Sequence, residues 1–117
     1  MLKIIVSGCN GHMGRSVVGI CANTSDVEVV AGLNRTAVSR DGFPVYSDPM
    51  EYAGEADVVI DFSNPANLTS LLNYSVERQV PIVLCTTGYS AEQLAEIEEA
   101  AKKVPVFKSG NMSLGVN

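Results

Sequence analysis

Short apolar runs that alternate with longer amphipathic stretches restrict this chain to one broad class of fold. Apolar runs of strand length occupy residues 2–6, 27–33, 57–61, 81–85 and 104–107. Apolar residues at helical spacing occupy residues 12–22 and 90–103, and another helical pattern begins at Asn64-Pro65. Strands that alternate with helices form a parallel sheet with helices on both faces. The sequence therefore predicts an α/β fold built on a doubly wound parallel sheet.

Local signals mark where two further elements begin. Ser90 is followed three positions later by Gln93, which is the spacing of a capping box. Pro49 follows Asp48, and proline is favoured at the first helical position because its missing N–H is not needed there. A helix is predicted to begin at each of these places, and residues 44–46 are predicted to form a short strand.

Length and charge limit the classes of function. The 117 residues suffice for one domain with a real core, and 46% of them are apolar. The net charge of −5 argues against binding of nucleic acid or an anionic membrane, since both need a basic field. No apolar run approaches the ~18 residues of a spanning helix, and the apolar start is too short for a signal peptide. We therefore expect a cytoplasmic protein with neither a membrane partner nor a nucleic-acid partner.

The cysteines do not indicate a metal site or a disulfide framework. There are three of them, without C-x-x-C spacing, and the chain has one histidine, so a zinc site lacks plausible ligands. Cys21 falls in a helical pattern and Cys85 ends an apolar strand, which predicts buried, inert thiols. Cys9 lies in a glycine loop, where the sequence predicts an accessible side chain.

The glycine loop at residues 8–15 is the main functional signal, because it follows the first strand and precedes a helix. Its glycines stand at i, i+3 and i+6, which differs from the common G-x-G-x-x-G spacing. Glycine still permits a tight turn and close approach of the backbone to a pyrophosphate, which sits at the helix N-terminus. The loop residues predicted to bind the cofactor are Gly8, Cys9, Asn10, Gly11, His12 and Met13. The alternative is a sharp turn that binds nothing.

The end of the second strand predicts which dinucleotide is bound. Selectivity for NAD usually comes from Asp or Glu about 20 residues after the fingerprint, and here Asn34 and Arg35 occupy that place. Asparagine does not repel a 2′-phosphate, and arginine binds one, so NADPH is favoured over NADH. Arg15 and Arg40 are secondary candidates for the same phosphate. The alternative is an ordinary surface turn.

Small polar residues follow the later strands, where ligands bind in open α/β sheets. The candidate cofactor residues there are Phe62, Ser63, Cys85, Thr86, Thr87, Ser109, Gly110, Asn111 and Met112. We interpret Asp61 as a structural group that holds loop amides, in preference to a catalytic base. The backbone of His12 matters more than its ring, and no nucleophile–base pair is evident. No catalytic residue is predicted.

Four motifs occur in order along the whole chain: Gly8-x-x-Gly11-x-Met13-Gly14-Arg15, Asp61-Phe62-Ser63-x-Pro65, Thr86-Thr87-Gly88 and Asn111-Met112-Ser113-x-Gly115-Val116-Asn117. Together they resemble the N-terminal half of bacterial 4-hydroxy-tetrahydrodipicolinate (dihydrodipicolinate) reductases. The resemblance implies a Rossmann domain that binds NADPH or NADH for a reduction in the diaminopimelate route to lysine. It departs from the family at Asn34, where an acidic residue is frequent, and at Cys85, which replaces a common glycine.

The resemblance also implies a second domain beyond residue 117. In that family the second domain supplies the proton donor, binds the dicarboxylate substrate and forms a homotetramer, so residues 1–117 are expected to be inactive alone. Two alternatives remain open at this point. One is a free-standing NAD(P)-binding regulatory or redox-sensing module, and the other is a different Rossmann dehydrogenase.

Overall fold

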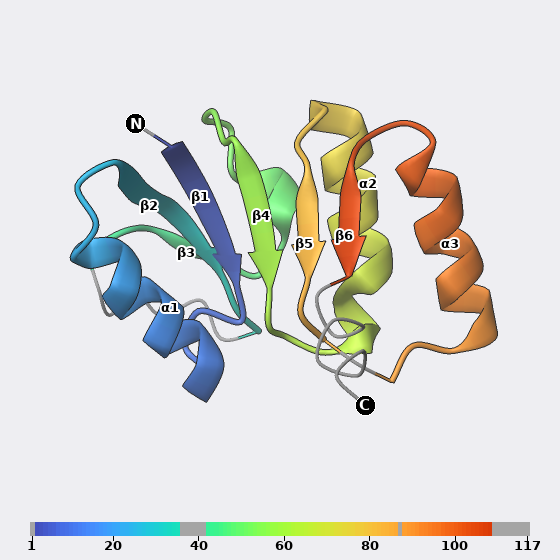
Figure 1. The fold of residues 1–117 in the computed structure, drawn as a ribbon, viewed down its shortest axis with the longest axis horizontal. Helices are drawn as coiled ribbons and strands as arrows, with labels where there is room; N and C mark the ends of the chain where they lie inside the picture. Colours follow the sequence, from blue (N-terminus) through green and yellow to red (C-terminus); the bar gives the residue numbers. More distant parts are fainter. Residues whose placement is uncertain (1, 36–41, 87, 109–117) are drawn as a thin grey trace.

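A six-stranded parallel sheet forms the centre of the computed structural model, which describes residues 2–35, 42–86 and 88–108 (Figure 1). Its strands are β1 (Leu2–Ser7), β2 (Val27–Leu33), β3 (Val45–Tyr46), β4 (Val58–Asp61), β5 (Ile82–Leu84) and β6 (Val106–Lys108). Their spatial order is β3-β2-β1-β4-β5-β6, and every neighbouring pair is parallel. This is the doubly wound order of the Rossmann fold, which confirms the predicted fold class.

Within the described residues, three α-helices cover the two faces of the sheet. They are α1 (His12–Ala22), α2 (Leu68–Arg78) and α3 (Ala91–Ala101), with short 3₁₀-helices η1 (Pro49–Glu51) and η2 (Pro65–Asn67). In Figure 1, α1 lies over the β1–β2 half of the sheet, while α2 and α3 lie beside each other at the β5–β6 half. The predicted helices at Pro49 and Pro65 thus begin as 3₁₀ turns, and only the second continues as an α-helix.

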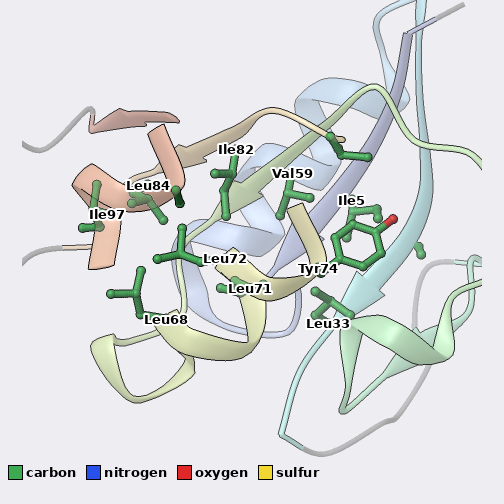
Figure 2. Packing of buried hydrophobic residues seen from close by; sticks show 13 residues of the cluster. Ile5, Leu33, Val59, Leu68, Leu71, Leu72, Tyr74, Ile82, Leu84 and Ile97 are labelled. Atoms are coloured by element: carbon green, nitrogen blue, oxygen red, sulfur yellow. The ribbon is translucent and has the colours of Figure 1, made fainter. Parts of the chain in front are cut away.

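The core consists of two apolar clusters, one on each face of the sheet. The larger joins Ile5 and strand residues such as Ile82 to Leu68 of α2 and Ile97 of α3, and Figure 2 shows these side chains converging. The smaller packs Ile4, Val6 and neighbouring residues against α1. Alternate residues of β1 therefore serve opposite faces, as the two-residue period of a strand requires. A strand buried on both faces reads as a continuous apolar run, which is why the sequence showed its strands so clearly.

Side chains cap the starts of most helices, as the sequence predicts. Ser90 and Gln93 form the capping box of α3, and Asp48 and Glu51 form one at η1. The Asn64 carboxamide accepts from the backbone of Ala66 at the start of η2, which leads directly into α2. No side chain caps the N-terminus of α1 or of α2, whose cap residues are Gly11 and Asn67.

The predictions for two cysteines are wrong. Cys9 is fully buried, because its side chain turns away from the loop and packs against Gly32 and Phe43 in the smaller core cluster. Cys85 is only half-buried, since the strand ends at Leu84, one residue earlier than the apolar run. Cys21 is buried as predicted, and burial raises the pKa of its thiol.

The described segments contain no helix that is both long enough and apolar enough to cross a membrane.

Candidate functional site

The carboxyl ends of the strands lie along the lower edge of the sheet in Figure 1. Successive strands are added in one direction from β1 to β2 and β3, whereas β4 returns to the other side of β1. Ligands of open α/β sheets bind where the strand order reverses in this way. A cavity of about 340 Å³ lies at that place, within the size range of small-molecule sites. Its lining residues are Ser7, Gly8, Gly11, Leu33, Asn34, Arg35, Ser47, Pro49, Phe62, Ser63, Asn64, Asn67, Ser70 and Leu71.

The glycine loop forms one wall of this cavity and depends on close backbone contacts. Gly8 has φ of +82°, and a Cβ there would lie 3.0 Å from the backbone of Phe62 and Ser63. A Cβ on Gly14 would lie 2.0 Å from the carbonyl oxygen of Gly8, so α1 rests directly on the loop. Two glycines are thus required by the conformation itself, which explains part of the unusual spacing.

Gly11 has a different role, because its φ of −80° suits any residue. A Cβ there would meet one neighbour, the Gly8 oxygen at 3.3 Å. Gly11 is exposed, lines the cavity and precedes the first residue of α1. The first turn of α1 also holds no acidic side chain. An uncapped helix N-terminus at the cavity wall provides N–H donors and a positive dipole end, which is the environment that a phosphate group prefers.

A second hollow of about 380 Å³ continues the crevice toward β5. It is lined by Met13, Phe62, Ser63, Asn64, Pro65, Cys85 and Thr86. Phe62, Ser63 and Asn64 line both hollows, so the segment after β4 divides one elongated crevice into two compartments. An elongated, two-compartment shape across the switch point matches the two halves of a dinucleotide.

None of the described residues that line the crevice carries a carboxylate, although the chain has 13 acidic residues. Among the described residues, Arg35 is the one charged side chain that lines either hollow. Asn34 stands beside it in the same cavity. A negatively charged acceptor there would therefore meet hydrogen-bond donors and one guanidinium, and no described lining residue would repel it.

Asp61 is the last residue of β4, directly before the segment that divides the two compartments, and its carboxylate is fully buried. Its Oδ1 accepts from the backbone N–H of Ser63 at 2.9 Å and from the Ser63 hydroxyl, and its Oδ2 accepts from the Thr86 hydroxyl at 3.4 Å. The carboxylate thus ties the end of β4 to the end of β5. This arrangement confirms the interpretation of Asp61 as a structural group that holds loop amides.

Tyr89 lies close to this carboxylate. Its hydroxyl is buried and has no hydrogen-bond partner among the described atoms. Burial, followed by the negative charge of Asp61, raises the pKa of Tyr89 to about 12, and the nearby Thr86 hydroxyl opposes the shift. Tyr89 is therefore a neutral phenol at physiological pH and adds no charge near the crevice.

The structure brings most of the described candidate residues into the crevice. Those that line it are Gly8, Gly11, Met13, Asn34, Arg35, Phe62, Ser63, Cys85 and Thr86. Asn10 and His12 belong to the loop but line neither hollow, and the side chain of Cys9 belongs to the core. Arg15, a secondary phosphate candidate, instead lines a hollow between α1 and β2. Thr87, Ser109, Gly110, Asn111, Met112 and Arg40 lie outside the described residues.

Sequence reasoning missed several lining residues: Ser7, Ser47, Pro49, Asn64, Asn67 and Ser70. Ser7 ends β1 and Asn64 follows β4, so the strand-end rule that selected Ser63 also applied to them. Ser47 and Pro49 come from the segment after β3, and no motif distinguishes them. The described residues contain no group of three or more His, Cys, Asp or Glu side chains that could hold a metal ion.

The strand order, the glycine loop and the crevice define a Rossmann-type domain of the nucleotide-binding class. Comparison with known proteins narrows the class. The family model described as "Dihydrodipicolinate reductase, N-terminus" matches residues 2–112. The chain belongs to this family.

Two relatives illustrate the similarity. The 4-hydroxy-tetrahydrodipicolinate reductase of Clostridium tetani (strain Massachusetts / E88) is 47% identical over 117 residues, which is all of this chain and 46% of that protein. The protein of the same name from Caldanaerobacter subterraneus subsp. tengcongensis is 46% identical, with the same coverage of both chains. The chain thus spans slightly less than half the length of the relatives it matches.

Solved structures share the fold. Dipicolinate-bound dihydrodipicolinate reductase from Paenisporosarcina sp. TG-14 superposes with a TM-score of 0.74 at 23% identity, covering 86% of this chain and 43% of that one. The WlbA dehydrogenase from Chromobacterium violaceum, solved with NADH and UDP-GlcNAcA, gives a TM-score of 0.76 at 18% identity, covering 92% and 34%. At these identities the likeness establishes the fold alone.

Proposed function

We propose that the crevice binds NADPH or NADH, and that residues 1–117 are the cofactor domain of a 4-hydroxy-tetrahydrodipicolinate reductase. The observation that carries the proposal is one crevice, at the switch point of a Rossmann sheet, that combines an uncapped helix N-terminus with Arg35 and with two compartments. Family membership supports the identity of the reaction. The full protein would reduce 4-hydroxy-tetrahydrodipicolinate to tetrahydrodipicolinate in the diaminopimelate route to lysine.

The donor set of the crevice fits a dinucleotide. In the proposed arrangement, the backbone of the glycine loop from Gly8 to Met13 holds the pyrophosphate at the start of α1. Asn34 and Arg35 hold the adenosine ribose and its 2′-phosphate. The nicotinamide end is assigned to the remaining candidates: Phe62, Ser63, Cys85, Thr86, Thr87, Ser109, Gly110, Asn111 and Met112.

The chemistry requires a second part of the protein. When bound, the cofactor supplies a hydride from C4 of the nicotinamide. Among the described residues that line the crevice, none is a histidine, a lysine or a carboxylate. The present residues therefore bind and orient, and the proton donor and the dicarboxylate site belong to a further domain. That domain, the homotetramer expected of the full-length protein and a cytoplasmic location are parts of this proposal.

The absence of carboxylates from the described lining residues favours NADPH over NADH. An acidic residue at the position of Asn34 would bind the free 2′-hydroxyl and repel a 2′-phosphate. Asparagine binds the hydroxyl without that repulsion, and Arg35 lines the same cavity. NADPH is therefore the preferred cofactor in our proposal, and NADH is tolerated.

Replacing Arg35 with alanine is expected to weaken NADPH binding about tenfold while NADH binding changes less than about twofold. A hydrogen bond to a charged group contributes roughly 1.5–3 kcal/mol, and exposure of Arg35 places the expected loss at the low end. Calorimetric titration with both cofactors measures the two dissociation constants. Arg15→Ala is the matched control, because Arg15 is also exposed but lines a different hollow. Equal losses for NADPH and NADH would contradict the assignment of Arg35 to the 2′-phosphate.

A further inference from the structure

The buried carboxylate of Asp61 determines which way the hydroxyl protons of two crevice residues point. An ionised carboxylate accepts hydrogen bonds and donates none. The hydroxyls of Ser63 and Thr86 therefore both donate to Asp61, which also accepts the Ser63 backbone N–H. Each hydroxyl has one proton, and in both residues that proton is directed away from the crevice.

Both residues belong to the crevice wall. Ser63 lines both compartments, and Thr86 lines the compartment next to β5. The Ser7 hydroxyl donates to Ser63 Oγ at 3.3 Å and thus occupies one of its lone pairs. Ser63 retains one lone pair and Thr86 retains at least one, because the neutral Tyr89 hydroxyl beside Thr86 can occupy the other, so both residues present acceptors and no donor.

We propose that Asp61 is a positioning residue that makes this part of the wall an acceptor-only surface, selecting a hydrogen-bond donor on the nicotinamide half of the cofactor. This inference rests on the proposed function. The donor is a ribose hydroxyl or the carboxamide NH₂, since both carry protons that such a surface accepts. The surface also disfavours the pyrophosphate, which is itself an acceptor. The pyrophosphate is thereby confined to the glycine loop. The ribose hydroxyls and the carboxamide are directed to the compartment beyond Ser63.

The Asp61→Asn variant tests this polarity with almost no change in shape. Its amide oxygen can replace Oδ1 and keep both bonds from Ser63, which preserves the end of β4. Its NH₂ group then replaces Oδ2 and donates a hydrogen bond to the Thr86 hydroxyl oxygen. In the wild type, the direction is opposite, because Oδ2 accepts from the Thr86 hydroxyl. The Thr86 proton is released toward the crevice, and an acceptor becomes a donor. The variant reverses the hydrogen-bonding sense of Thr86 and leaves the glycine loop and Arg35 untouched.

The experiment compares two ligands by calorimetric titration of the wild-type chain and the Asp61→Asn variant. NADP⁺ carries the nicotinamide half, whereas 2′,5′-ADP carries only the phosphorylated adenosine half. We expect the variant to bind NADP⁺ about tenfold more weakly and 2′,5′-ADP within about twofold of wild type. Unchanged NADP⁺ binding, or equal losses for both ligands, would overturn the inference. If wild type binds neither ligand, the proposed function itself fails.

Thr86 provides a second test that does not depend on the buried position. Thr86→Ser keeps the hydroxyl and is expected to keep NADP⁺ affinity, whereas the isosteric Thr86→Val is expected to lose about tenfold for NADP⁺ alone. Equal affinities of the two variants would overturn the role of Thr86. The 3-acetylpyridine analogue of NADP⁺ lacks the carboxamide NH₂. If wild type binds it about tenfold more weakly than NADP⁺, the donor is the carboxamide; equal binding assigns the donor to the ribose.

Discussion

Replacing Gly14 with alanine is expected to destabilise the domain by at least about 3 kcal/mol and to weaken NADPH binding roughly 100-fold. The added Cβ would lie 2.0 Å from the carbonyl oxygen of Gly8, a distance that no real Cβ contact reaches. The obstacle is backbone and not a flexible side chain, so α1 and the loop must move apart. That movement displaces the helix N-terminus from the crevice. Chemical denaturation and calorimetric titration of the variant measure the two effects.

Gly19→Ala is the matched control for this substitution. Gly19 lies in the same helix, is exposed, and a Cβ there has no neighbour within 4 Å. Alanine is favoured over glycine in a helix by about 1 kcal/mol, so the control is expected to be slightly more stable and to bind normally. If Gly14→Ala were as stable as Gly19→Ala, the close contact between α1 and the glycine loop would be wrong.

Replacing Leu68 with alanine is expected to lower the free energy of unfolding by about 2–5 kcal/mol. Leu68 is 0% exposed and is the first residue of α2, where it joins the larger core cluster with residues of four β-strands and α3 (Figure 2). Removing its side chain loses apolar burial and leaves a cavity. The loss is a large fraction of the stability of an ordinary domain. The midpoint of thermal or urea unfolding provides the measurement.

Leu94→Ala repeats the same chemical change at the surface. Leu94 lies in α3 and is 40% exposed, so its replacement is expected to change stability by less than about 1 kcal/mol. A loss as large as that of Leu68→Ala would show that α3 packs differently from the arrangement described here.

The fold was predictable because its sheet is buried on both faces. The apolar runs at residues 2–6 and 27–33 correspond to β1 and β2 almost residue for residue. The prediction was less accurate for the short strand β6. The apolar run begins at Val104, whereas pairing with β5 begins at Val106. Val104 is buried without belonging to the sheet. Hydrophobicity reports burial, and in an edge strand burial and pairing need not coincide.

The site was predictable where function depends on local backbone chemistry. Glycine spacing and the residue position after β2 identified the loop and Asn34-Arg35, which line one cavity. Contributions from separate segments were not predictable, because Ser47 reaches that cavity only through the pairing of β3 with β2. The wrong expectation for Cys9 has the same origin. Loop residues are usually exposed, but this one lies over Gly32, where the absence of a side chain makes room for the thiol.

Titration of the chain with NADPH and NADH at one ionic strength shows whether this crevice binds a nicotinamide dinucleotide. We expect one site per chain with micromolar affinity, tighter for NADPH because Arg35 lines the cavity and no described lining residue is a carboxylate. Cooperative unfolding of the same sample establishes that the chain is folded. If a folded chain bound neither cofactor, the crevice would not be a site for a nicotinamide dinucleotide.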